Sequence, residues 1–210
     1  MKITQIKPAR HRQTAVYLDE ERYLIDTETF LLSGYRQGDT LSFEEFKELQ
    51  IQSQNNRAYE KALYLLEYRA HARGELWQKI TREYPKEAAE QALVRVEALG
   101  LINDHDFATR LAEELTTQKG YGKARVKADL QRRGIDREII DTVLENLPQD
   151  QTESCRMYMT KKCKTPPTDP KEQAKLLAGA VRRGFDYATA RSVLKELVSQ
   201  ESEDAPWQFE

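Results

Sequence analysis

The sequence predicts a mainly all-α protein in which three tandem three-helix repeats form an elongated curved solenoid, preceded by a small α+β amino-terminal cap. Three observations predict this class. Charged residues make up 32% of the 210 residues, above the roughly 25% of average globular domains, which suits a helical protein with much solvated surface. The first fifty residues alternate like strands, and the pattern then becomes helical. Similar strings recur at a spacing of fifty residues.

The cap is expected over residues 1–52. The segments "ITQIK", "TAVYL" and "RYLID" alternate apolar and polar residues and predict a β-hairpin or a three-stranded sheet. The segment "TETFLLSG" then predicts a short helix that ends at Gly34. Ser42 and Glu45 have the spacing of a capping box and begin another helix. The polar segment at 52–56, "QSQNN", is the best candidate for a linker.

Three repeats of three helices each are expected, at residues 57–104, 105–150 and 151–198. Leu76, Val126 and Leu176 are spaced by fifty residues, and so are Ile135 and Phe185, each of which follows a turn glycine. A single repeat of this length buries little surface, but stacked neighbours share a continuous apolar seam. We therefore expect these five residues to form part of that seam.

Turn and cap signals divide the repeats into helices. The first helices are expected at 57–70, 105–118 and 152–163. Asp136 and Asp186 follow the turn and can cap the third helices, and Asp169 before Pro170 fits an N-cap followed by proline. The proline-containing segment "CKTPPTD" predicts a loop, and residues 199–210, with Trp207, an acidic and flexible tail.

A basic stretch, "KGYGKARVKADLQRRGID" at 119–136, is the best candidate for a binding surface. It is not a phosphate loop of the Walker type, because Thr117 stands where the first glycine is needed and Ala124 where a hydroxyl is needed. It predicts instead the second helix of the second repeat, with Val126 and Leu130 in the seam and a left-handed turn at the glycine that follows.

The charges of this stretch do not form one stripe. At 100° per residue, Lys123 and Lys127 share one flank of the seam, whereas Arg125 and Arg132 lie near the opposite side. A solvated helix surface is the alternative reading for each of them alone. The cluster is a stronger signal, and a second cluster at 156–164 contains four basic residues and no acidic one. Three basic patches along a solenoid would suit an extended anionic partner, either a nucleic acid or an acidic protein groove.

The residues expected to contact that partner share a basic or an interleaved aromatic character and lie in the second and third repeats: Lys119, Tyr121, Lys123, Arg125, Lys127, Arg132, Arg133, Lys161, Lys162, Arg182 and Arg183.

The sequence contains no enzyme constellation. Cys155 and Cys163 are eight residues apart with no histidine between them, which fits no zinc or redox spacing and predicts two reduced thiols. His71 is expected in a turn or on the surface rather than as a ligand. We therefore expect no catalytic residues, no metal and no cofactor. The net charge of −2 provides no global basic field, and no apolar run is long enough to span a membrane, so a cytoplasmic monomer is expected.

At these residues the sequence resembles the RecX family of regulators of the RecA recombinase. The resemblance covers about residues 57–198, through "ALYLLEYRAHARGELWQKI", "GLINDHDFA", "KGYGKARVKADLQRRGID" and "AVRRGFDYATARSVLKEL". The amino-terminal segment is similar to the β-containing extension of the longer members. The "REYP" turn and the proline-rich loop depart from the family pattern.

The resemblance implies a non-enzymatic protein that binds the RecA filament on single-stranded DNA and inhibits its activities in recombination, repair and the SOS response. The alternative is a direct single-stranded DNA-binding protein that competes with RecA; its affinity would fall steeply with salt.

Overall fold

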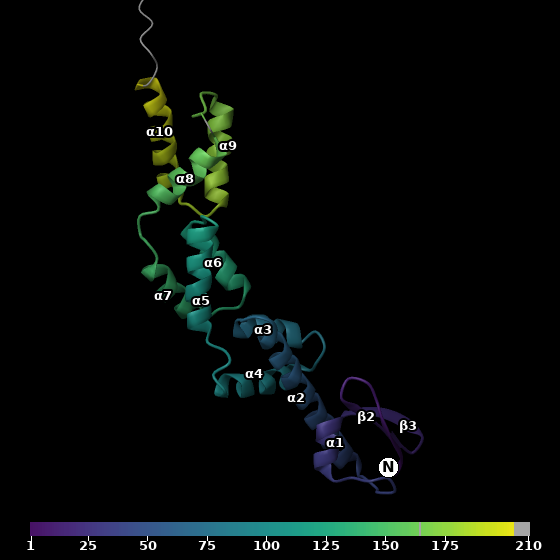
Figure 1. Ribbon diagram of the computed structural model, residues 1–210. Coiled ribbons are helices and arrows are strands. Elements are labelled where there is room, and N and C mark those ends of the chain that lie inside the picture. The colour runs from purple at the N-terminus through teal and green to yellow at the C-terminus, as the bar shows by residue number, and fades with distance from the viewer. Residues whose placement is uncertain (164, 204–210) are drawn as a thin grey trace, which may run out of the picture. The chain divides into compact units, whose positions relative to one another are not determined.

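A computed structural model of the chain describes residues 1–163 and 165–203 (Figure 1). The predicted acidic tail with Trp207 lies largely outside the described residues, as does one lysine of the second basic cluster, Lys164. The chain divides into two compact units, Met1–Asn103 and Asp104–Glu210. The protein is mainly helical with one small sheet, so the predicted fold class is confirmed.

The first unit begins with an antiparallel sheet in the order β1-β2-β3. Its strands are Ile3–Pro8, Gln13–Leu18 and Glu21–Asp26, as the alternation predicted. Both hairpins have left-handed backbone at non-glycine residues, His11 and Arg12 in the first and Asp19 and Glu20 in the second. One face of the sheet packs on helices α1 (Thr27–Ser33) and α2 (Phe43–Tyr68) around a core that includes Ile3, Val16, Ile25, Phe30 and Phe46.

Helix α2 is continuous through the segment that was expected to be a linker. The capping box predicted at its start is present, with Ser42 N donating to Glu45 Oε2 at 2.7 Å and Glu45 N donating to Ser42 Oγ at 3.2 Å. The prediction of a linker at 52–56 was wrong because two of its polar residues face the cap. Ser53 Oγ accepts a hydrogen bond from the backbone N–H of Asp26 at 2.7 Å, and Asn56 donates to the Asp26 carboxylate at 2.8 Å. The first helix of repeat 1 therefore begins in the cap rather than at residue 57.

Repeat 1 consists of the second half of α2 with α3 (Arg73–Ile80) and α4 (Lys86–Ala98). Small residues of α2, Ala58 and Ala62, are fully buried and let α4 approach closely. Leu76 and Ile80 of α3 and Leu93 of α4 fill the rest of this core.

The second unit holds the two other repeats. Repeat 2 consists of α5 (Asp104–Glu113), the π-helical segment η1 (Glu114–Gln118), α6 (Lys123–Arg132) and α7 (Arg137–Asn146). Repeat 3 consists of α8 (Thr152–Lys162), α9 (Pro170–Arg182) and α10 (Tyr187–Glu203), the helices at the green and yellow end of Figure 1.

The predicted seam is buried. Val126 and Leu176 of the second helices are at most 7% exposed, and Ile135 and Phe185 after the turns are at most 6% exposed. The predicted caps are also present. Asp136 accepts from Glu138 N, Asp169 from Lys171 N and Asp186 from Thr189 N.

Repeats 2 and 3 interlock through backbone. The first N–H groups of a helix have no partner within that helix. At the start of α6 they are satisfied by the turn after α9: Gly122 N donates to Arg183 O at 2.9 Å and Ala124 N to Gly184 O at 3.1 Å. The two backbone segments approach so closely that a Cβ on Gly122 would overlap the Gly184 carbonyl, and a Cβ on Gly184 would overlap Arg125 N. Two glycines thus fix the junction between repeats 2 and 3.

Candidate partner-binding site

Two lysines of the basic stretch face α7. Lys123 Nζ donates to Gln149 Oε1 at 2.8 Å, and Lys127 Nζ lies 3.3 Å from Asp141 Oδ1. The prediction that these lysines share one flank of α6 is confirmed. The Asp141 carboxylate offsets the charge of Lys127, whereas the partner of Lys123 is a neutral amide, so Lys123 keeps its positive charge.

A buried carboxylate holds the other flank. Asp129 is 11% exposed; its Oδ2 lies 3.4 Å from Arg125 Nε, and its Oδ1 pairs with Arg132. Arg133 lies with its guanidinium 5.7 Å from the centre of the Phe107 ring on α5. One carboxylate therefore pairs with two of the predicted contact arginines, Arg125 and Arg132, and offsets one of their two positive charges.

Arg183 joins the two repeats at the glycine interlock. Its Nη1 donates to the Lys119 carbonyl oxygen at 2.7 Å, and its guanidinium lies 5.1 Å from the ring centres of both Tyr121 and Tyr158. Such cation–π geometry holds the arginine in place while most of its N–H donors stay available. The Tyr121 ring, whose centre also lies 5.6 Å from the Arg125 guanidinium, is half-buried.

A cavity of about 340 Å³ opens beside this arginine. Four cations line it, and none of the described lining residues is acidic: Lys119, Lys161, Lys162 and Arg183. Lys119 has a carboxylate partner, since its Nζ lies 2.9 Å from Glu114 Oε1. Lys161 and Lys162 are exposed and form no ion pair within the described part of the chain. Lys161 and Lys162 of α8, together with Arg183, therefore carry the uncompensated positive charge of this cavity.

A second cavity, of about 410 Å³, shares Tyr158 and Lys162 with the first and extends along α9. Arg182 and Lys175 line it, together with one acidic residue, Glu172. Gly179 of α9 makes room here, because a Cβ at this position would lie 2.7 Å from the Tyr158 hydroxyl oxygen. Tyr158 thus stands between two neighbouring basic cavities.

The π-helical segment η1 forms one wall of the first cavity. Its wider turn is closed by a bond from Lys119 N to Glu114 O at 3.3 Å, and Gly120 then turns the chain with φ +60°. Single π-helical turns are common at functional sites, because they displace a side chain from the regular helical surface.

The predicted contact residues therefore separate into two groups. The junction brings together Lys119, Tyr121, Lys161, Lys162, Arg182 and Arg183. The remaining five are held by partners within repeat 2: Lys123, Arg125, Lys127, Arg132 and Arg133. Sequence analysis missed the positions of Tyr158 and Asp129. No local signal in the sequence could have paired Tyr158 with Arg183.

No arrangement of side chains resembling a metal centre is found, since the described residues contain no group of three histidine, cysteine or acidic residues placed to hold a metal ion. Cys155 is buried and unpaired. Burial, with a smaller contribution from the negative charge of Asp186, raises the pKa of the Cys155 thiol to about 11. The thiol is therefore protonated near neutral pH and is a poor nucleophile.

His71 lies in the connection between α2 and α3, as the turn reading expected, but it is buried rather than on the surface. It is 3% exposed, with Nδ1 2.8 Å from Arg69 O and Nε2 2.7 Å from Lys79 Nζ. An ammonium can only donate and a carbonyl can only accept, so these contacts fix the neutral tautomer with the proton on Nδ1. Burial lowers the pKa of His71, in agreement with this tautomer.

Among the described residues, no helix has the length and apolar character needed to cross a membrane.

Comparison with known proteins identifies relatives of both parts of the chain. Residues 58–95 match the family model of the first three-helix domain of RecX, and residues 103–144 match that of its second three-helix domain. The regulatory protein RecX of Chlorobaculum tepidum is 34% identical over 153 residues, which cover 72% of this chain and 94% of that protein. The regulatory protein RecX of Clostridioides difficile is 24% identical over 208 residues, covering 96% and 98%.

Solved structures agree with the fold. A crystal structure of regulatory protein RecX aligns with a TM-score of 0.65 at 20% identity and covers 92% of this chain and 98% of its own. The crystal structure of RecX from Lactobacillus salivarius aligns with a TM-score of 0.59 at 21% identity over 70% of this chain and 97% of its own.

Proposed function

Because the chain belongs to the RecX family of regulatory proteins, we propose that it regulates RecA without catalysing a reaction, by binding the filament of RecA on single-stranded DNA. Binding along the filament would inhibit its recombinase, ATPase and co-protease activities. RecA assembles on DNA, so the proposed site of action is the bacterial cytoplasm, and we propose that the chain acts as a monomer.

The observation that carries this proposal is the basic junction of repeats 2 and 3. Lys161 and Lys162 have no carboxylate partner within the described residues, and Arg183 projects beside them. Single-stranded DNA within a protein filament presents a line of phosphates. A protein surface that binds these phosphates carries lysine and arginine rather than acidic side chains. A small cationic cavity with two flanking aromatic rings suits a phosphodiester or a carboxylate group.

The proposed roles differ between the residues. Arg182 and Arg183 would form bidentate hydrogen bonds to phosphate or carboxylate oxygens, whereas Lys161 and Lys162 would act as point charges. Lys119 and Tyr121 would mainly position Arg183, through the carbonyl and the ring that contact it.

The five residues held within repeat 2 would contribute less. Lys127 and Arg132 must each leave a carboxylate before they bind another anion, so part of the new interaction is offset by the loss of the old one. We propose that Lys123, Arg125 and Arg133 likewise act at the margin of the interface.

The second candidate function is competition for bare single-stranded DNA. The observation that favours it is the pair of rings, Tyr121 and Tyr158, beside uncompensated lysines, because bases stack on such rings without sequence preference. The net charge of −2 argues against high affinity for DNA alone.

The test measures ATP hydrolysis by RecA on single-stranded DNA during titration with the chain, and separately the binding of the chain to bare DNA at two salt concentrations. Inhibition at concentrations well below those that bind bare DNA would support recognition of the filament. If inhibition appears only where bare DNA is saturated, and disappears with added salt in parallel with DNA binding, competition is the better account. Absence of inhibition at any concentration would reject both.

A further inference from the structure

A second candidate site lies in the first unit, along α2 beside its contact with α4, and Arg95 of α4 also lines it. Seven residues of α2 line a cavity of about 860 Å³ at the helical spacing of 56, 59/60, 63/64 and 66/67. Tyr59, Leu63 and Leu66 are half-buried against the repeat 1 core, and Tyr64 is 67% exposed. An apolar stripe at this period normally packs against another helix. Arg95 of α4 covers the Tyr59 ring, and the cavity lies beside the remainder of this stripe.

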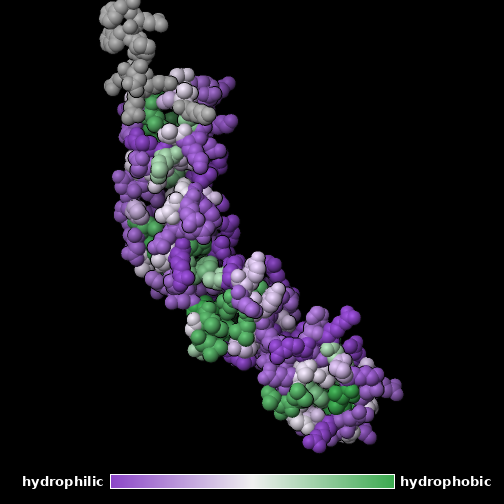
Figure 2. All heavy atoms as spheres, in the orientation of Figure 1, coloured by the Kyte–Doolittle hydropathy of each residue, from purple (hydrophilic) through white to green (hydrophobic). Residues whose placement is uncertain are grey.

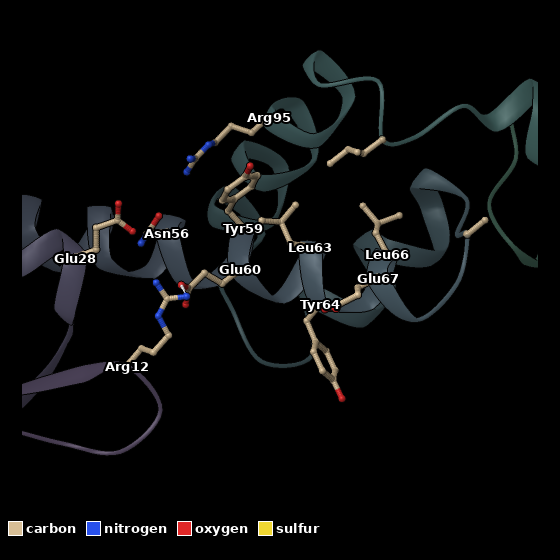
Figure 3. A pocket seen from close by; sticks show the side chains of 12 residues that line it. Arg12, Glu28, Asn56, Tyr59, Glu60, Leu63, Tyr64, Leu66, Glu67 and Arg95 are labelled. Atoms are coloured by element: carbon tan, nitrogen blue, oxygen red, sulfur yellow. Dashed lines mark ion pairs between the residues drawn. The ribbon is translucent and has the colours of Figure 1, made fainter.

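The groove has two defined ends. At one end lie Arg12 of the first hairpin and Glu28 of α1, and at the other Leu66 and Glu67 of α2 (Figure 3); Ala70 and Leu101 are also part of the lining. Figure 3 shows Tyr59, Leu63 and Leu66 pointing to one edge of α2 and Tyr64 to the other edge. Hydrophobic residues also gather over α4 in Figure 2, and Val94, Leu99 and Leu101, in and after that helix, are 47% to 60% exposed.

The length of the stripe suits a short helix. From Asn56 to Glu67 the α2 axis rises by about 16 Å, at 1.5 Å per residue, which is three helical turns. A helix that lies in a groove is recognised by anchors at i, i+3 or i+4 and i+7, which also span two to three turns. A strand would need edge N–H and C=O groups, and the backbone of α2 has none to offer because a helix satisfies them internally.

The charges of the rim are not balanced. Arg12 is engaged, since its Nη1 lies 2.6 Å from Glu60 Oε1, and Arg95 stacks over the Tyr59 ring at 3.7 Å. Glu28 and Glu67 form no ion pair within the described residues, and they lie near opposite ends of the stripe. These two carboxylates would repel a nucleic acid and attract a basic group at each end of an apolar segment.

We propose that this groove binds an amphipathic helix of a partner protein, with about three turns of apolar residues flanked at each end by lysine or arginine. The site differs from the basic junction in its residues and in the chemistry of its ligand, so it extends the proposed function to a second, protein-binding contact. Tyr64 and the half-buried Leu63 and Leu66 would receive the apolar anchors, and Glu28 and Glu67 would set the direction and the charge preference.

The test uses a fluorescein-labelled synthetic peptide of 18 residues with leucines on one face of its central three turns and lysines at both ends. We expect the full chain to bind it, by fluorescence anisotropy, at least tenfold more tightly than a peptide of the same composition in scrambled order. Glu28→Lys with Glu67→Lys should weaken binding about tenfold and favour a peptide with glutamates in place of the lysines. Tyr64→Ala, at an exposed position, should weaken it several-fold.

The matched control is Glu20→Lys with Glu87→Lys, which makes the same charge change at two exposed residues outside the groove and should leave binding unchanged. Circular dichroism of each variant establishes that it is folded. Equal binding of the ordered and scrambled peptides, or equal binding by the groove and control variants, would overturn the proposal. Sedimentation equilibrium provides the other decisive outcome. If the chain self-associates and the groove charge reversals abolish that association, the occupant is a second copy of the chain and the proposal is wrong.

Discussion

The cap joins repeat 1, and repeat 2 joins repeat 3, by different physical means. The first connection is one continuous helix, α2, whose middle is held by side-chain hydrogen bonds from Ser53 and Asn56 to Asp26. The second is a contact between two backbone segments. Gly122 and Gly184 let the start of α6 approach the turn after α9, and backbone N–H groups at the start of α6 donate hydrogen bonds to carbonyl groups of that turn. The continuous helix is held by its own backbone hydrogen bonds, whereas the glycine contact depends on the absence of two side chains. Substitutions should therefore affect the two connections in different ways.

The largest effect is expected at Gly184. Gly184→Ala adds a Cβ that overlaps Arg125 N at a residue with φ +94°, so steric overlap and backbone strain combine. We expect the free energy of unfolding of the second unit to fall by about 4 kcal/mol. The measurement is urea unfolding by circular dichroism, with hydrogen exchange of the α6 amides to locate the change.

Gly120→Ala is the matched control, because Gly120 has φ +60° and open space around its Cβ position. It should cost only about 1 kcal/mol. Equal losses for the two variants would mean that strain alone, and not the close backbone contact, determines the effect.

The next effect concerns the helix that replaced the expected linker. Gln54 is an exposed residue in the middle of α2. Gln54→Pro removes a helical hydrogen bond and introduces a clash with the preceding turn, so we expect a loss of about 3 kcal/mol in the stability of the first unit. Gln54→Ala should be neutral or slightly stabilising. Equal free energies of unfolding for the proline and alanine variants would indicate that this segment is a linker and not part of a continuous helix.

A smaller effect is expected from the polar contacts that hold α2 against the cap. Ser53→Ala leaves the backbone N–H of Asp26, a residue only 1% exposed, without its partner. Leaving a buried donor unsatisfied should cost about 2 kcal/mol, less than breaking the helix itself. Thermal unfolding of Ser53→Ala beside Gln54→Ala measures the difference, and equal midpoints would contradict the assigned role of the serine.

The smallest effect is the pH dependence from His71. Burial lowers its pKa in the folded chain, so the unfolded chain takes up this proton first as the pH falls through about 6.5. Protonation therefore favours unfolding, and the stability that His71 contributes above that pH is lost below it. We expect the urea midpoint of the wild type to fall more between pH 7.5 and 5.0 than that of His71→Gln, whose side-chain oxygen can still accept from Lys79. Parallel pH profiles would show that His71 does not titrate in this range.

The regular part of the fold could be predicted because it is local. Seam residues recur at fifty-residue spacing, and caps such as Asp136 and Asp186 precede their helices by a fixed interval. The continuity of α2 could not be predicted, because the hydrogen-bond partner of Ser53 and Asn56 is Asp26, which lies 27 and 30 residues earlier in the chain. A polar helical segment with a distant partner has the same composition as a linker.

The candidate site was predictable in its residue types but not in its grouping. The sequence showed a cluster of cations, yet Asp129 pairs with two of them, and Arg183 donates a hydrogen bond to Lys119, 64 residues earlier in the chain. The glycines of the two "RRG" segments were interpreted as turn residues. The contact that one of them, Gly184, makes with Gly122 depends on how two repeats stack.

The central claim is that the junction of repeats 2 and 3 binds the partner, and charge reversal on α8 tests it most directly. Lys161→Glu with Lys162→Glu changes two exposed side chains that form no ion pair among the described residues, so folding should be unaffected. Reversal of Arg125 and Lys127 is less informative, because it would place glutamates beside Asp129 and Asp141. The control is Lys47→Glu with Lys86→Glu, an equal charge change at exposed residues of the first unit.

The measurement is the concentration of each variant that halves ATP hydrolysis by RecA on single-stranded DNA. The account predicts at least a tenfold increase for the α8 variant and less than a twofold change for the control. Equal inhibition by both variants and the wild type would contradict the assignment of this junction as the partner-binding site.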